Sequence, residues 1–235
     1  MSAEHITSKW MGKMFPDEKE FRRVDRFGNR REWTAPGLDI TAKVVCIECN
    51  MGWMSKTIED KHAKPAMSPL MLGEINAPFG KKEARSLALF AYKSAIVLDY
   101  AQRHREPFFS RRLRHAFREH LFIPRMVGMW MAPYVPDNYR RRFDHRVSLH
   151  KGELTPGNEL QTYVCTFGLG ALAFQVLAWK QLYIANFRPL TGFDDLAVPF
   201  WPVLPPDYVW PGFHRLRSFD HFKEFHERWD SVAPA

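Results

Sequence analysis

Apolar side chains recur at helical spacing in the second and last thirds of the chain. Over residues 82–103 they follow a period of about 3.6 residues, which predicts a long helix with one face in the core. Ser110 can cap a second helix over residues 111–122. Ser218 can cap a final helix that carries Phe219, Phe222, Phe225 and Trp229 on one face.

Three other segments have the composition of β-strands. Residues 126–133, 160–168 and 171–180 are rich in apolar side chains, and Gly168 and Gly170 separate the last two, which predicts an antiparallel arrangement. Residues 199–211 hold five prolines among aromatic side chains. Because proline cannot donate to a sheet ladder, we expect an extended surface segment there and no central strand.

The first seventy residues have a different pattern. Residues 16–41 are charged and contain Gly28-Asn29 and Pro36-Gly37, so a hairpin or a long loop is expected. Residues 43–45 predict a short strand, and residues 55–61 a short helix that Pro65 and Pro69 would end. We place a domain boundary at residues 73–80, between an amino-terminal unit (residues 1–72) and a second α+β domain (residues 73–235). The expected fold class is α+β.

Charge distinguishes the middle of the chain from its ends. The chain of 235 residues has a formal net charge of +8, and 46% of its residues are hydrophobic, enough to fill a core. Residues 81–151 contain 16 Lys and Arg against 6 Asp and Glu, whereas residues 1–72 contain 12 against 10. This excess favours a surface that contacts nucleic acid, although a solvated arginine-rich face would have the same composition.

The chain lacks the patterns that mark export or membrane insertion. No apolar run approaches the roughly 20 residues that a membrane-spanning helix needs, and the first ten residues do not resemble a signal peptide. We therefore expect a cytoplasmic protein that does not enter a membrane. Three cysteines, two of them close together as Cys46 and Cys49, make a disulfide framework unlikely.

Three short pieces of sequence together could hydrolyse a phosphodiester. This reaction needs a base for water, a divalent cation to stabilise charge, and a group that holds the base in place. His5 is suited to act as a base near neutral pH, and Glu4 and Glu59 offer the oxygen ligands that Mg²⁺ prefers. Asn50 can hold an imidazole or a loop by hydrogen bonds without adding charge.

The same pieces resemble the HNH (ββα-metal) endonucleases, in particular a bacterial group. The residues that carry the resemblance are Glu4-His5-Ile6, then Cys46-Ile47-Glu48-Cys49-Asn50-Met51-Gly52-Trp53-Met54-Ser55, then Glu59. It implies that Glu4 is a metal ligand, His5 the general base and Asn50 the residue that braces the loop facing the metal. Glu59, nine residues after Asn50, takes the place of the last metal ligand, with Asp60 as its substitute. The implied cofactor is Mg²⁺ or Mn²⁺.

Relatives of this group also hold zinc with two Cys-x-x-Cys pairs, of which this sequence contains one. Structural zinc is held by four ligands, so Cys46 and Cys49 are half a site. The other ligands could come from upstream or from Cys165 and His62, or no zinc binds. An alternative of equal weight is that Cys46 and Cys49 are two small buried thiols in a tight turn.

The expected function is metal-dependent hydrolysis of DNA, with DNA favoured over RNA as partner. Candidate contacts to the nucleic acid are Arg111, Arg112, Arg114 and Arg118 on the predicted helix, and Arg140, Arg141 and Arg142 further along. His115 and His120 are five residues apart and do not share a ligand face. The alternatives are an inactive HNH scaffold that binds nucleic acid or a protein partner, and an arginine-rich middle that binds RNA or protein.

Overall fold

The computed structural model describes most of the chain. It covers residues 2–5, 8–15, 20–24, 30–34, 41–74, 76–102, 106–135, 143–155, 158–180, 187–189, 192–203, 208–211 and 214–231. Within these ranges no helix combines the length and the apolar character that crossing a membrane requires.

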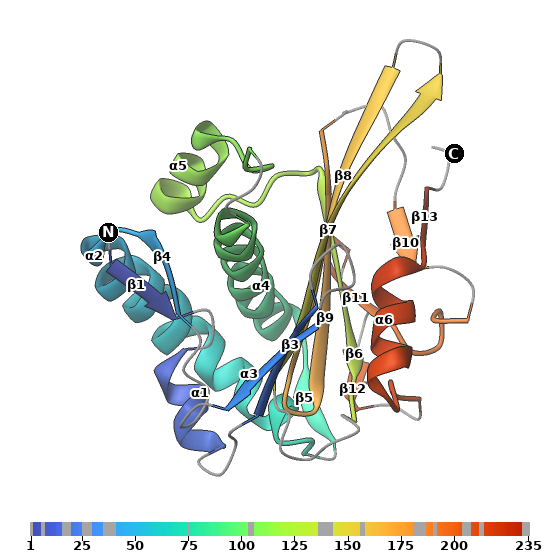
Figure 1. Ribbon diagram of the computed structural model, residues 1–235. Helices are drawn as coiled ribbons and strands as arrows, with labels where there is room; N and C mark the ends of the chain where they lie inside the picture. The colour runs from blue at the N-terminus through green and yellow to red at the C-terminus, as the bar shows by residue number, and fades with distance from the viewer. Residues whose placement is uncertain are drawn as a thin grey trace.

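A five-stranded antiparallel sheet forms the centre of the molecule (Figure 1). Its strand order is β11 (Val198–Trp201), β6 (Val127–Pro133), β9 (Leu172–Trp179), β8 (Asn158–Leu169) and β7 (Phe143–Thr155). The predicted strands β6, β8 and β9 are confirmed. β11 lies at the edge, so the proline-rich segment does not enter the centre of the sheet, as predicted.

Both faces of this sheet are buried under hydrophobic clusters. Successive side chains of a strand point to opposite faces. On β9, Phe174 and Val176 belong to one hydrophobic cluster, and Ala173 and Leu177 belong to a second cluster on the other face. A sheet covered on both faces accounts for strands whose sequences are almost continuously apolar.

One long helix covers the first face and a short helix covers the second (Figure 1). α4 (Lys81–Ala101) confirms the predicted long helix, and every residue from Ser86 to Asp99 is buried. α6 (Phe219–Glu227) begins at Ser218, whose side chain accepts a hydrogen bond from the His221 N–H. Trp229 was predicted on this helix, which is wrong, because the chain turns extended at Arg228 and Trp229 begins strand β13 (Trp229–Ser231).

α5 (Arg111–His120) confirms the predicted arginine-rich helix. The Ser110 side chain accepts a hydrogen bond from the Leu113 N–H at 3.3 Å, as expected of an N-cap. The helix ends two residues before the predicted end, because Leu121 adopts a left-handed backbone conformation (φ 49°) and closes it.

The amino-terminal part contains two paired strands followed by a long helical segment. β1 (Ser2–His5) pairs antiparallel with β4 (Thr41–Val45), and α1 (Lys9–Met14) follows β1 in the sequence. β4 leads into α2 (Ile47–Cys49), the π-helical segment η1 (Asn50–Ala63) and α3 (Lys64–Met71). The strand predicted at residues 43–45 is confirmed.

The helix predicted at residues 55–61 is longer than expected. Pro65 and Pro69 were expected to end it, and this is wrong, because helical backbone continues from η1 through Lys64 into α3. Pro65 stands where η1 passes into α3, and Pro69 lies inside α3.

Further strands form short pairs around the central sheet. β2 (Glu20–Val24) and β3 (Arg30–Thr34) form an antiparallel hairpin, as the hairpin alternative for residues 16–41 predicted, and β2 contacts β7. β5 (Ala77–Phe79) pairs with β12 (Tyr208–Trp210), and β10 (Phe187–Pro189) pairs with β13.

The elements together confirm the α+β class. Buried residues from both sides of the predicted boundary at residues 73–80 belong to one hydrophobic cluster, for example Ile58 and Met67 with Leu87 and Phe90. The division into two domains stays a prediction.

Candidate functional site

Pairing of β1 with β4 brings the first two motifs of the sequence together. His5 lies opposite Thr41 and Glu4 opposite Ala42 in the register of these strands. β4 then leads directly into Cys46 and the helical segment that carries Asn50 and Glu59. The backbone order of the three motifs is therefore strand, strand, helix. The side chains of Glu4 and His5 lie outside the described part of the structure, so their role stays a prediction.

The Cys46–Asn50 turn joins β4 to the helical segment. Cys46 is the N-cap of α2, and its Sγ accepts a hydrogen bond from the Cys49 N–H at 3.3 Å. Asn50 is half-buried, with helical backbone angles, at the end of this turn. Ile47 and Met51 beside it are exposed. The reading of two buried thiols is wrong, because Cys46 is exposed and only Cys49 is partly covered.

Hydrogen bonding and burial act on the two thiols in opposite directions. Hydrogen bonds from the Cys49 side chain and backbone lower the pKa of Cys46, and Arg118 adds a smaller contribution in the same direction. Burial raises the pKa of Cys49. Cys46 is therefore the thiol that ionises more easily and the better donor to a metal or an electrophile.

Glu59 is buried on η1 and does not face open solvent. Its Oε1 lies 2.5 Å from Nζ of Lys93, a fully buried lysine of α4. Among the described residues, only Lys93 bonds this carboxylate, so its second oxygen is left for another ligand. Asp60, the predicted substitute, is exposed on the next position of the segment.

A pocket of about 250 Å³ lies between the Cys46–Asn50 turn, η1, α4 and α5. We call it the α4–α5 pocket. The residues that line it are Val45, Cys46, Cys49, Trp53, Met54, Lys93, Ile96, Val97, Tyr100, Arg114, His115, Phe117 and Arg118. The pocket thus adjoins the strand that pairs with the His5 segment.

The described arginines of the basic stretch fall into two groups. Arg114 and Arg118 line the α4–α5 pocket, whereas Arg111 and Arg112 are exposed and do not line it. Cζ of Arg114 lies 4.2 Å from the centroid of the Tyr100 ring, a cation–π contact. The predicted contacts at residues 140–142 lie outside the described residues.

The side chains proposed as further zinc ligands lie in different surroundings. Cys165 is fully buried in β8, where burial raises its pKa to about 12, and His62 is half-buried on η1. Across the described ranges, no three His, Cys, Asp or Glu side chains come together to hold a metal ion. Zinc binding at Cys46 and Cys49 stays a prediction.

Sequence reasoning missed Lys93 and the α4–α5 pocket. Lys93 lies in the middle of the apolar helix pattern, between Phe90 and Ile96. A lysine at such a position needs a buried anionic partner, and this requirement was the signal that could have pointed to Glu59. The pocket itself depends on how the Cys46–Asn50 turn, η1, α4 and α5 meet, and it has no signal in the sequence.

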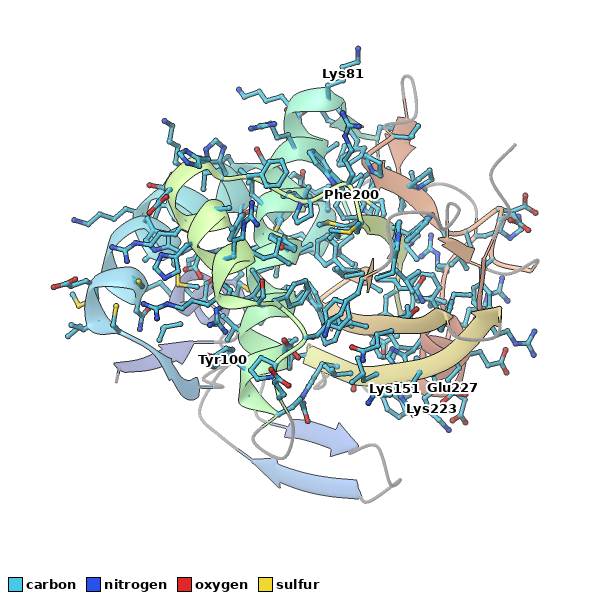
Figure 2. The ribbon with its side chains drawn as sticks, turned by 90° about the horizontal axis from the view of Figure 1, so that it is seen from above. Lys81, Tyr100, Lys151, Phe200, Lys223 and Glu227 are labelled. Carbon is cyan, nitrogen blue, oxygen red and sulfur yellow. The ribbon has the colours of Figure 1, made fainter. Side chains whose placement is uncertain are left out.

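A second polar cluster lies between β7 and α6, away from this pocket. The Ser148 hydroxyl bonds the His150 ring at 2.8 Å and Nε2 of His226 at 3.0 Å, and Nδ1 of His226 bonds Thr166. Burial, with Arg146 and His150 nearby, lowers the pKa of His226 to about 3. Figure 2 shows Tyr100, at the pocket, well separated from Glu227 of α6. The cluster holds α6 against the sheet and is not part of the candidate site.

Comparisons of the chain with models of protein families, with curated proteins and with solved structures each returned no match.

Proposed function

We propose that this protein is a metal-dependent endonuclease of the HNH type that hydrolyses DNA phosphodiester bonds. The observation that carries the proposal is the pairing of β1 with β4, which places the Glu4-His5 segment beside the strand that leads into the Cys46–Asn50 turn and η1. The first motif, which lies 40 positions before Cys46 in the sequence, thereby joins the other two in one strand–strand–helix arrangement.

Each residue of this arrangement has a part that its chemistry allows. His5 takes the proton from the attacking water, and Asn50 holds the loop that joins β4 to the helix. Glu4 and Glu59 would hold a divalent cation, Glu59 through the carboxylate oxygen that Lys93 does not bond. Asp60 is the substitute ligand. When bound, Mg²⁺ or Mn²⁺ stabilises negative charge on the scissile phosphate and the leaving oxygen.

The arginines of α5 supply the positive surface for the DNA backbone. Arg111 and Arg112 are exposed on α5, and Arg118 lies on the same helix at the α4–α5 pocket. Contacts of this kind bind without regard to base sequence and weaken steeply as salt is added.

Nicking of supercoiled plasmid with Mg²⁺ or Mn²⁺ tests the proposal. We expect His5→Ala to lower the nicking rate by a factor of about 10² or more, which is what loss of a general base costs. His214→Ala, a change of an exposed histidine elsewhere, is the matched control and should cut at the parent rate. Thermal unfolding checks that both variants are folded. A His5→Ala protein that nicks plasmid as fast as the parent would refute the assignment of His5 as the general base.

The Lys93–Glu59 ion pair favours a second candidate, a scaffold that binds nucleic acid without cutting it. In this arrangement the buried ammonium of Lys93 supplies the positive charge that a metal would bring to Glu59. Calorimetric titration with Mn²⁺ separates the two. The nuclease should bind Mn²⁺ more tightly than its Glu59→Gln variant does. The scaffold should retard DNA in gels containing EDTA, show equal Mn²⁺ titrations for both proteins, and never nick plasmid.

A further inference from the structure

The α4–α5 pocket has an apolar interior. Trp53 and Met54 from η1, Ile96 and Val97 from α4, and Phe117 from α5 line it. Most ligand pockets enclose about 300–1,000 Å³. A volume of about 250 Å³ therefore suits one small, largely apolar group and not an extended chain.

Positive charge lines the side of the pocket that α5 forms. Arg114 and Arg118 are one helical turn apart, so both guanidinium groups belong to the same face of α5. Within the described ranges, neither forms an ion pair with a carboxylate. Lys93, deeper in the pocket, is already neutralised by Glu59. The net charge left for a ligand is that of the two arginines.

The occupant should therefore combine a flat apolar body with an anionic group. Guanidinium groups match the oxygens of a phosphate by paired hydrogen bonds, and aromatic walls accept a nucleobase. A fatty acid would need a longer apolar channel than this volume supplies. The exposed Arg111 and Arg112 lie next to the pocket along α5 and could contact the following phosphates of a strand.

We infer that the α4–α5 pocket binds a nucleoside monophosphate, with its base among the apolar side chains and its phosphate on Arg114 and Arg118. The inference deepens the proposed function and rests on it only in taking DNA as one source of the nucleotide. The same chemistry is offered by a free nucleotide and by the phosphorylated end of a DNA strand.

Isothermal titration of the full chain with deoxyadenosine 5′-monophosphate, in EDTA, tests the inference. We expect saturable binding, and binding weaker by about tenfold or more for deoxyadenosine, which lacks the phosphate. The double variant Arg114→Gln/Arg118→Gln should bind the monophosphate more weakly than the parent by a similar factor. Arg125→Gln, at an exposed position outside the pocket, is the control and should bind like the parent. Trp53→Phe should reduce the fluorescence change on binding, because Trp53 lines the pocket.

Competition identifies the source of the nucleotide. Displacement of the monophosphate by duplexes with 5′-phosphate ends, and not by duplexes with 5′-hydroxyl ends, supports a strand end. Binding of the monophosphate without competition from either duplex supports a free nucleotide. Absence of saturable binding at millimolar monophosphate, or parent-like binding by the double arginine variant, overturns the inference. His5→Ala should bind the monophosphate like the parent, because the proposed contacts of the nucleotide do not include His5. The nicking assay of this variant therefore tests the proposed function, and the titration tests the pocket.

Discussion

Lys93 of α4 and Glu59 of η1 form an ion pair in the interior of the protein. Nζ and Oε1 are 2.5 Å apart, and the lysine side chain has no exposed surface. The pair joins the helical segment that follows the Cys46–Asn50 turn to the helix that covers the central sheet. Charges removed from water in this way are tolerated only together, since each compensates the desolvation of the other.

Lys93→Met should destabilise the protein by about 3–5 kcal/mol, because it leaves the Glu59 carboxylate buried without its partner. Urea denaturation followed by circular dichroism measures the change. Lys82→Met, at an exposed position of the same helix, should leave the midpoint almost unchanged. The double variant Lys93→Met/Glu59→Leu should recover much of the loss. A single variant within about 1 kcal/mol of the parent would show that the pair carries little stability.

Gly170→Ala should destabilise the protein more than Gly192→Ala does. Both glycines have a positive φ, of 60° and 102°, so alanine is strained at either position. At Gly170, however, an added Cβ would lie 2.5 Å from the carbonyl oxygen of Met71, whereas nothing lies within 4 Å at Gly192. Thermal melts of the two variants give the difference directly. Equal losses would mean that the β8–β9 turn moves freely away from α3.

Cys46 should react with a thiol reagent long before Cys165 in the folded protein. Cys46 is exposed and its pKa is lowered by hydrogen bonds from Cys49, whereas burial raises the pKa of Cys165 to about 12. Alkylation at neutral pH followed by peptide mass spectrometry should find the label on Cys46 first, and on Cys165 only after unfolding in urea. Cys46→Ser should remove the fast phase. Early labelling of Cys165 would contradict the buried position of β8.

The stability of the protein should fall as the pH is lowered from about 6.5 towards about 3. His226 has a pKa of about 3 in the folded protein, because burial disfavours its charged form, and an ordinary pKa of about 6.5 when unfolded. Between these values the unfolded chain binds the proton and the folded chain does not, so acid favours unfolding. His226→Gln should flatten this slope in urea titrations at pH 4 to 7, whereas His214→Gln should keep it.

Much of the fold could be predicted because its patterns are long and regular. α4 and strands β8 and β9 bury consecutive residues, so their apolar character is visible in the sequence. β7 was not predicted, although apolar and polar residues alternate along part of it. Its polar side chains, such as Arg146 and Ser148, pair with α6 and resemble a solvated surface until that helix is placed against them. The end of the helical segment was misplaced because Pro65 and Pro69 were taken as terminators, whereas helical backbone continues past both of them.

The candidate site could be predicted only in part. Residue chemistry and the resemblance to the HNH endonucleases grouped Glu4, His5, Asn50 and Glu59, and pairing of β1 with β4 is a backbone relationship consistent with that grouping. No local pattern reveals that Glu59 meets Lys93, because the two are 34 residues apart and come together only when η1 packs on α4. Long-range packing therefore determines what this carboxylate can bind.

The shared core of η1, α3 and α4 has a consequence for engineering. Ile58, Met67 and Met71 are fully or almost fully buried in the cluster that contains Leu87 and Phe90. A fragment cut after residue 72 would carry these side chains into water, at a cost of about 1.5–3 kcal/mol for each. We therefore expect the motif-bearing segment to stay folded in a chimaera only when α4 accompanies it.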